Sequence, residues 1–122
     1  MAKQCLIIDD ELVMQQLISA MVARCGFEPR LASNAQQALQ LAREGNFDLA
    51  TVDLMLPEVS GLDLLKQFKS DLTLKHIPTI VISAAADTAE WDEARRLGAS
   101  ALLKKPFTLQ EMRETIQKIT GG

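Results

Sequence analysis

The fold is decided by a stretch near the N-terminus that reads Cys5-Leu6-Ile7-Ile8-Asp9-Asp10. A continuous apolar run of this kind is typical of a strand buried on both faces, as in a parallel sheet. Three later runs also end at polar residues: Leu49 to Val52 at Asp53, Ile80 to Ile82 at Ser83, and Leu102 to Leu103 at Lys104 and Lys105. Because parallel strands point the same way, we expect these polar residues to gather at one edge of a sheet, where ligands bind.

Amphipathic helices are predicted between the strands. The first is followed by Gly26 as a C-terminal cap. Its apolar residues recur at helical spacing: Met14, Leu17, Ile18, Met21, Val22 and Cys25. Later helices are expected after the N-cap Asn34, around Leu62 to Phe68, over residues 87–97, and from Leu109 to Ile119, with a weak strand near residues 28–32. The alternation predicts a flavodoxin-like α/β fold, a doubly wound sheet of five parallel strands in the order 2-1-3-4-5 with five helices.

Length and composition predict one domain over residues 1–122. The chain is 48% hydrophobic and 24% charged, and no apolar run approaches the ~20 residues of a membrane span. The start Met1-Ala2-Lys3-Gln4 leads straight into a strand, so we expect no signal peptide and a cytoplasmic location. A net charge of −3 with scattered basic residues argues against a nucleic-acid surface. Cys5 and Cys25 are interpreted as small buried hydrophobic residues.

Three carboxylates are expected to meet at the switch point of this sheet. In the order 2-1-3-4-5 the first and third strands are neighbours, which places Asp9 and Asp10 beside Asp53. Such groups repel one another unless a cation or a proton relieves them. Mg²⁺ suits the cluster, because it takes one or two carboxylates together with a phosphate oxygen and several waters.

The ordered set of motifs resembles a family over essentially the whole chain. The set comprises Asp9-Asp10, Asp53 followed by Leu54-Met55-Leu56-Pro57, Gly61, Ser83-Ala84, Gly98-Ala99 and Lys105-Pro106-Phe107. It is similar to the receiver domain of bacterial two-component response regulators, and in particular to single-domain, chemotaxis-type receivers. A lone acidic pair would mean little, but each of these motifs closes or follows the expected element.

The resemblance implies a role for each site residue. Asp53 would accept a phosphoryl group from a sensor histidine kinase or a phosphotransfer protein, and Lys105 and Ser83 would contact the phosphoryl oxygens. Asp10 and Asp53 would bind Mg²⁺ directly, Asp9 through water, and the backbone carbonyl of Met55 would complete the protein ligands. The domain would catalyse only its own phosphoryl transfer and dephosphorylation. Members of the family typically hold a cis bond before the proline that follows the lysine.

The same resemblance implies an output face built from the fourth helix, the fifth strand and the fifth helix, which would bind a downstream protein and neither nucleic acid nor membrane. Leu102 stands where the family usually has tyrosine or phenylalanine, so the coupling across this face is expected to differ. Trp91 is interpreted either as an interface residue or as a residue at the edge of the core.

Plainer interpretations stand beside these. Asp9 and Asp10 would also serve as caps of the first helix, and Ser83 as a turn residue. Strand alternation sends Lys104 and Lys105 to opposite sides, and Lys104 and His76 are interpreted as surface residues. At the level of function the alternatives are an interaction module of receiver fold that is never phosphorylated, a phosphatase-type hydrolase and a flavodoxin.

Overall fold

The computed structural model describes residues 3–84 and 88–121, and its strands and helices alternate as expected. The elements are β1 (Lys3–Ile8), α1 (Leu12–Arg24), β2 (Phe27–Ala32), α2 (Ala35–Glu44), β3 (Leu49–Asp53), α3 (Gly61–Ser70), β4 (Thr79–Ser83), α4 (Thr88–Arg96), β5 (Ala101–Lys104) and α5 (Leu109–Thr120). All strand pairs are parallel, in the order β2-β1-β3-β4-β5. The predicted flavodoxin-like topology is confirmed. Residue 87, with which the fourth helix was expected to begin, lies outside the described residues.

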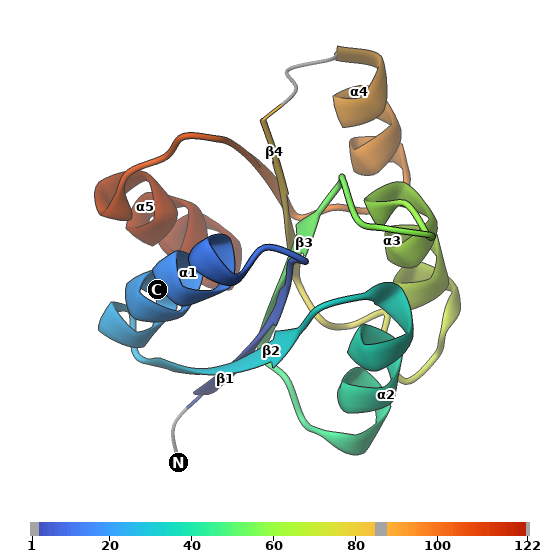
Figure 1. Cartoon of the computed structure of the whole chain (residues 1–122), viewed down its shortest axis with the longest axis horizontal. Helices are drawn as coiled ribbons and strands as arrows, with labels where there is room; N and C mark the ends of the chain where they lie inside the picture. Colours follow the sequence, from blue (N-terminus) through green and yellow to red (C-terminus); the bar gives the residue numbers. More distant parts are fainter. Residues whose placement is uncertain (1–2, 85–87, 122) are drawn as a thin grey trace.

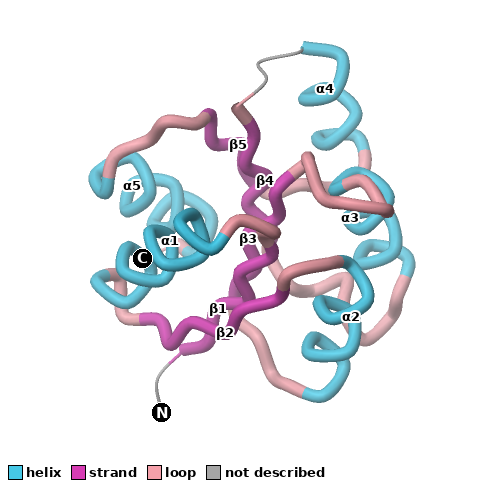
Figure 2. The backbone as a smooth tube through the Cα atoms, viewed as in Figure 1, coloured by secondary structure: helices cyan, strands magenta, loops and turns pink. Residues whose placement is uncertain are grey.

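The sheet separates two layers of helices. Figure 1 shows α1 and α5 on one face and α2, α3 and α4 on the other, and Figure 2 shows the strands edge-on between them. Residues of β1 alternate between the two cores: Cys5 and Ile7 pack with α1 and α5, whereas Leu6 and Ile8 pack toward α2 and α3. Burial on both faces is why β1 is apolar from Cys5 to Ile8. In the described part of the chain, no helix is both long and apolar enough to cross a bilayer.

The apolar stripe predicted for α1 is wrong at one position. Leu17 is 42% exposed, and the polar residue Gln15 is buried on the inner side of the helix. The Gln15 amide donates hydrogen bonds to the backbone carbonyl of Asp9 at 2.6 Å and to Ser33 Oγ at 3.0 Å. A buried amide is tolerated because these bonds replace its contacts with water. The start of α1 is thereby attached to the ends of β1 and β2.

The loop between β3 and α3 is held close to the end of β3. The N–H of Leu54 donates to the Ile82 carbonyl at 3.1 Å, and the N–H of Gly61 donates to the Leu54 carbonyl at 3.0 Å. Ser60 caps α3 by accepting a hydrogen bond from the N–H of Asp63. A Cβ atom on Gly61 would collide with the backbone of Asp53 and Leu54. Position 61 therefore needs glycine for close approach.

We predict that Gly61→Ala destabilises the fold and moves the end of β3. The added methyl group meets backbone, which cannot rotate away, so we expect a loss of about 1–3 kcal/mol in unfolding free energy, as for other overpacked sites. Urea unfolding followed by circular dichroism measures this loss. Gln67→Ala, at an exposed position of the same helix, is the control and should leave the midpoint almost unchanged. Equal midpoints for Gly61→Ala and the wild type would contradict the prediction.

Candidate functional site

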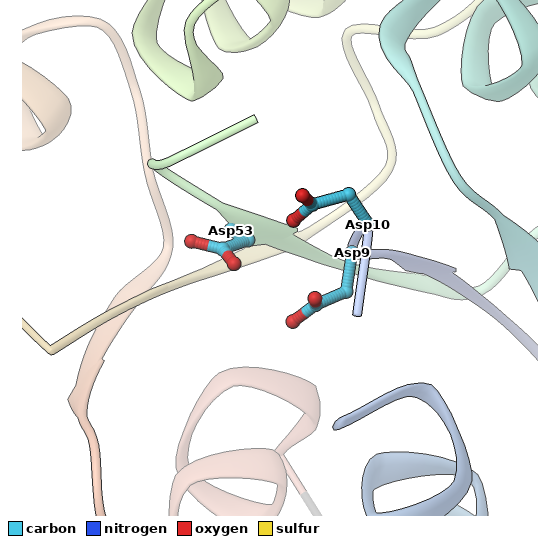
Figure 3. Close-up of side chains that lie close together, drawn as sticks. All are labelled: Asp9, Asp10 and Asp53. Atoms are coloured by element: carbon cyan, nitrogen blue, oxygen red, sulfur yellow. The ribbon is translucent and has the colours of Figure 1, made fainter. Parts of the chain in front are cut away.

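The three predicted carboxylates meet at the carboxyl edge of the sheet. Ile8 of β1 lies opposite Val52 of β3, so the residues that follow them, Asp9 and Asp53, are neighbours. Carboxylate oxygens of Asp9, Asp10 and Asp53 all lie within 4.8 Å of one another. Figure 3 shows the three side chains extending to the same side of the strand ends. The expected convergence of these residues, which are distant in sequence, is confirmed.

Asp53 is buried and is held at both carboxylate oxygens. Only 3% of the Asp53 surface is exposed. Oδ1 accepts a hydrogen bond from the N–H of Met55 at 2.9 Å, and Oδ2 accepts one from Lys105 Nζ at 3.2 Å. These two contacts fix the orientation of the carboxylate. The Met55 side chain itself is exposed.

Lys105 supplies the positive charge of the site. Its Nζ lies 3.2 Å from Asp53 Oδ2 and 3.6 Å from Asp9 Oδ2. Burial alone would lower the pKa of Lys105, but the carboxylates of Asp53 and Asp9 outweigh burial and raise this pKa above 10.5. The ammonium group therefore stays charged at neutral pH. Lys104 ends β5 as an exposed side chain, which agrees with the expected alternation.

Asp9 carries the least satisfied oxygen of the cluster. Its Oδ1 accepts a hydrogen bond from the N–H of Glu11 at 2.9 Å, whereas the buried Oδ2 has no hydrogen-bond partner among the described residues. Burial raises the pKa of Asp9 and repulsion from Asp53 and Asp10 adds to this effect, although the Glu11 N–H and Lys105 oppose it. A buried oxygen in this state is suited to a cation or to a water bound to one.

Asp10 does not act as the cap of α1. The N-cap position is Glu11, and its side chain makes no capping hydrogen bond. Asp10 is exposed and directs its carboxylate toward the same region as Asp9 and Asp53 (Figure 3). The interpretation of the acidic pair as helix caps is therefore not supported for Asp10, while Asp9 does accept the Glu11 N–H.

Ser83 and Lys105 reach the site through the register of β4 and β5. Asp53 lies opposite Ile82, and Ser83 lies opposite Lys104. The N–H of Lys105 donates to the Ser83 carbonyl at 2.9 Å, and a cis bond joins Lys105 to Pro106, as the resemblance led us to expect. Ser83 is fully buried at the end of β4. Its hydroxyl therefore belongs to the carboxyl edge, next to the strand that carries Asp53.

The two residues singled out on the expected output face lie at the edge of a small core. Trp91 and Leu102 are partly buried and pack against a cluster that contains Leu54, Val81 and Ala94. Trp91 thus contributes to packing, as expected of a residue at the edge of the core. Its role as an interface residue stays a prediction. His76 is exposed in the segment before β4, as expected.

The raised pKa of Asp9 predicts a pH effect on stability. A carboxyl group that binds its proton more tightly in the folded than in the unfolded protein stabilises the fold below its unfolded pKa, near 3.8. That contribution is lost as the pH rises through the raised folded value. In metal-free buffer at neutral pH we therefore expect Asp9→Asn to be more stable than the wild type, because it removes a buried charge and keeps an acceptor for the Glu11 N–H.

Urea unfolding at several values between about pH 4 and pH 8, where carboxyl groups complete their titration, measures this difference. The advantage of Asp9→Asn should grow as the pH rises. Glu28→Gln removes an exposed carboxylate from β2 and should show no such trend. A constant difference between Asp9→Asn and the wild type across the range would show that Asp9 has no raised pKa.

Comparison with known proteins agrees with the geometry. A family model for the response regulator receiver domain matches residues 5–117. The polar-differentiation response regulator DivK of Brucella anthropi is 36% identical over 121 residues, which are 99% of this chain and 98% of that protein. DivK of Brucella ovis is 35% identical over the same length and with the same coverage.

Solved structures show the same fold. A putative response regulator from Chloroflexus aurantiacus superposes with a TM-score of 0.93 at 25% identity, and both chains are covered completely. The receiver domain of a sensor histidine kinase from Pseudomonas aeruginosa, crystallised with a magnesium ion in its active site cleft, gives a TM-score of 0.89 at 24% identity with both chains fully covered. With the family model matching almost the whole chain, this protein belongs to the response regulator receiver domain family of two-component signalling.

Proposed function

We propose that the chain is a phosphoacceptor module that takes a phosphoryl group onto Asp53 from the phosphohistidine of a kinase or phosphotransfer protein. The observation that carries this proposal is the buried Asp53 carboxylate, oriented by the Met55 N–H and by Lys105 at the carboxyl edge of the sheet. Membership of the receiver family makes the protein a signalling module rather than a metabolic enzyme. The phosphorylated state would be read by a downstream protein at the face formed by α4, β5 and α5.

The acidic cluster fits a magnesium ion. Asp10 and Asp53 would bind it directly, Asp9 through a water molecule, and the Met55 backbone carbonyl would complete the protein ligands. Two observations support this fit: the carboxylate oxygens gather within 4.8 Å, and the buried Asp9 Oδ2 lacks a hydrogen-bond partner among the described residues. When bound, the ion would offset the negative charge of the carboxylates and of the incoming phosphoryl group.

The residues of the chain account for the remaining chemistry. An Asp53 carboxylate oxygen attacks phosphorus, the P–N bond to the donor imidazole breaks, and its electron pair stays on the imidazole. The Lys105 ammonium, 3.2 Å from Asp53 Oδ2, is close enough to transfer its hydrogen bond to a phosphoryl oxygen. The Ser83 hydroxyl would donate to a second phosphoryl oxygen. Hydrolysis of the acyl phosphate would restore the free carboxylate.

Acetyl phosphate tests this proposal without a kinase. In the presence of Mg²⁺ the full chain should gain one phosphoryl group, which intact mass spectrometry detects and which is lost by hydrolysis on standing once the acetyl phosphate is removed. Asp53→Asn keeps the size of the side chain and removes the nucleophilic carboxylate, so it should gain none. Circular dichroism confirms that the variant is folded. A wild-type protein that stays unmodified, or an Asp53→Asn variant that is modified equally, would refute the assignment and favour an interaction module that is never phosphorylated.

The surface beside Asp53 is suited to a protein donor. A phosphohistidine reaches Asp53 only if its carrier covers the carboxyl edge of the sheet. At that edge α1 exposes Leu12, Val13 and Leu17, at 64%, 75% and 42%. A groove of about 330 Å³ continues this surface, and Leu17 and Phe107 belong to its lining. An exposed apolar patch of this kind marks an interaction site, and we propose that the donor packs on it.

Val13→Ser separates binding of the donor from the chemistry. With a protein phosphodonor we expect slower transfer to Val13→Ser than to the wild type, because apolar contact area is lost. With acetyl phosphate the two rates should be the same, since Asp53 and Lys105 are untouched. Leu72→Ser is the matched control, because Leu72 is 79% exposed but follows α3, away from β1. If Val13→Ser and Leu72→Ser slow transfer equally, the donor does not use the α1 surface.

A further inference from the structure

A second cavity lies at the end of the sheet opposite Asp53. Its volume is about 330 Å³, and its lining includes Lys3, Arg24 and Arg113. Lys3 begins β1 and lies opposite Phe27, which begins β2, so the cavity is at the amino ends of the strands. Arg24 ends α1, and Arg113 comes from α5. We name it the basic cavity, defined by Lys3, Arg24 and Arg113.

The basic cavity has a positive charge that the described residues do not neutralise. None of its lining residues is acidic. None of the three cations forms an ion pair within residues 3–84 and 88–121, which is also true of other basic residues such as Lys66 and Lys75. The whole chain has 16 acidic and 13 basic residues. Three basic residues and no acidic one line a single cavity of a chain that is acidic overall, so the local charge is positive, and an anion would offset it.

The groups around the basic cavity select the kind of anion. Arginine presents a planar fork that binds phosphate through two hydrogen bonds, and two arginines can each take one phosphoryl group. The Gln117 amide is a further donor in the lining. Lys3 Nζ lies 5.9 Å from the centre of the Phe27 ring, which holds the ammonium at the wall. Phe27 is only 5% exposed, so it offers no open ring face on which a nucleobase could stack.

Two of the carbonyl groups at the end of α1 are occupied by local hydrogen bonds. Carbonyl groups at the C-terminus of a helix carry partial negative charge. Here the carbonyls of Val22 and Ala23 accept hydrogen bonds from the N–H groups of Cys25 and Gly26, at 3.0 and 3.1 Å. These carbonyls are thus satisfied locally, and the guanidinium of Arg24 is the charged group that α1 contributes to the cavity.

We propose that the basic cavity binds a small anion of the diphosphate class, with Arg24 and Arg113 each contacting one phosphoryl group. The site is separate from the phosphoacceptor edge and does not depend on the function proposed for that edge. Because Lys3, Arg24 and Arg113 belong to β1, α1 and α5, a bound diphosphate would connect these three elements. Its binding is therefore expected to raise the thermal midpoint of the protein.

Inorganic diphosphate is the probe, titrated into the full chain in metal-free buffer with a chelator and followed by two-dimensional NMR. Without metal, the carboxylates of Asp9, Asp10 and Asp53 repel the probe, so binding at the carboxyl edge is suppressed. We expect saturable shifts at the amides of residues 24–27 and 113–117, and none at residues 53–55. Arg24→Gln and Arg113→Gln should each weaken binding by about tenfold or more, since each removes hydrogen bonds to a charged group.

Arg95→Gln is the matched control. Arg95 is an exposed arginine near the end of α4, outside the basic cavity, and its loss should leave the affinity unchanged. Thermal midpoints in the absence of the probe show whether each variant is folded. The proposal is overturned if the shifts do not saturate at diphosphate concentrations up to about 1 mM, because a dissociation constant above that value means weak binding. It is equally overturned if Arg95→Gln weakens binding as much as the two cavity variants, or if the shifts occur at residues 53–55.

Discussion

The contact between Lys105 and the carboxylates of Asp53 and Asp9 is the interaction on which the site depends. Both carboxylates are buried and adjacent, an arrangement that electrostatic repulsion opposes. The lysine ammonium offsets this repulsion from one side, at 3.2 and 3.6 Å. It reaches that position because the Lys105 N–H bonds to the Ser83 carbonyl, which aligns the end of β5 with β4. The register of β4 and β5 thus places the positive charge that offsets the carboxylates. A cation bound by the three aspartates would offset the remaining negative charge.

The same balance limits how a phosphoryl group on Asp53 would act on the rest of the protein. A hydrogen bond to a charged group contributes about 1.5–3 kcal/mol, whereas driving a two-state equilibrium from 1:99 to 99:1 needs about 5.5 kcal/mol. The Ser83 hydroxyl alone is therefore insufficient, and Lys105, the metal contacts or a bound partner must contribute. Leu102 offers neither a hydroxyl nor an aromatic ring to this coupling. It packs instead against the cluster around Val81 and Ala94, so any shift at β5 would pass through apolar packing.

The fold and the acidic site follow from local patterns, and the exceptions have physical causes. Continuous apolar runs identified strands buried on both faces, and parallel order then required Asp9 and Asp53 to be neighbours. The helical periodicity predicted the wrong burial for Gln15 and Leu17. It depends only on residue polarity, whereas Gln15 is buried because its amide donates hydrogen bonds to acceptors that follow two strands. It also does not reveal Lys3, Arg24 and Arg113 as a group. These residues are far apart in sequence and meet only because β1 begins where α1 ends.

The direction of the elements explains part of the charge distribution and leaves part of it unexplained. In a parallel βα fold the helices run opposite to the strands, so their C-termini carry partial negative charge at the amino edge of the sheet. Every helix has a basic residue in its last turn, Arg24 among them, and the helix dipole accounts for these. Lys3 lies on a strand and Arg113 lies in the middle of α5, so no helix end accounts for either. Their convergence on Arg24 is what distinguishes an anion site from ordinary capping of helix ends.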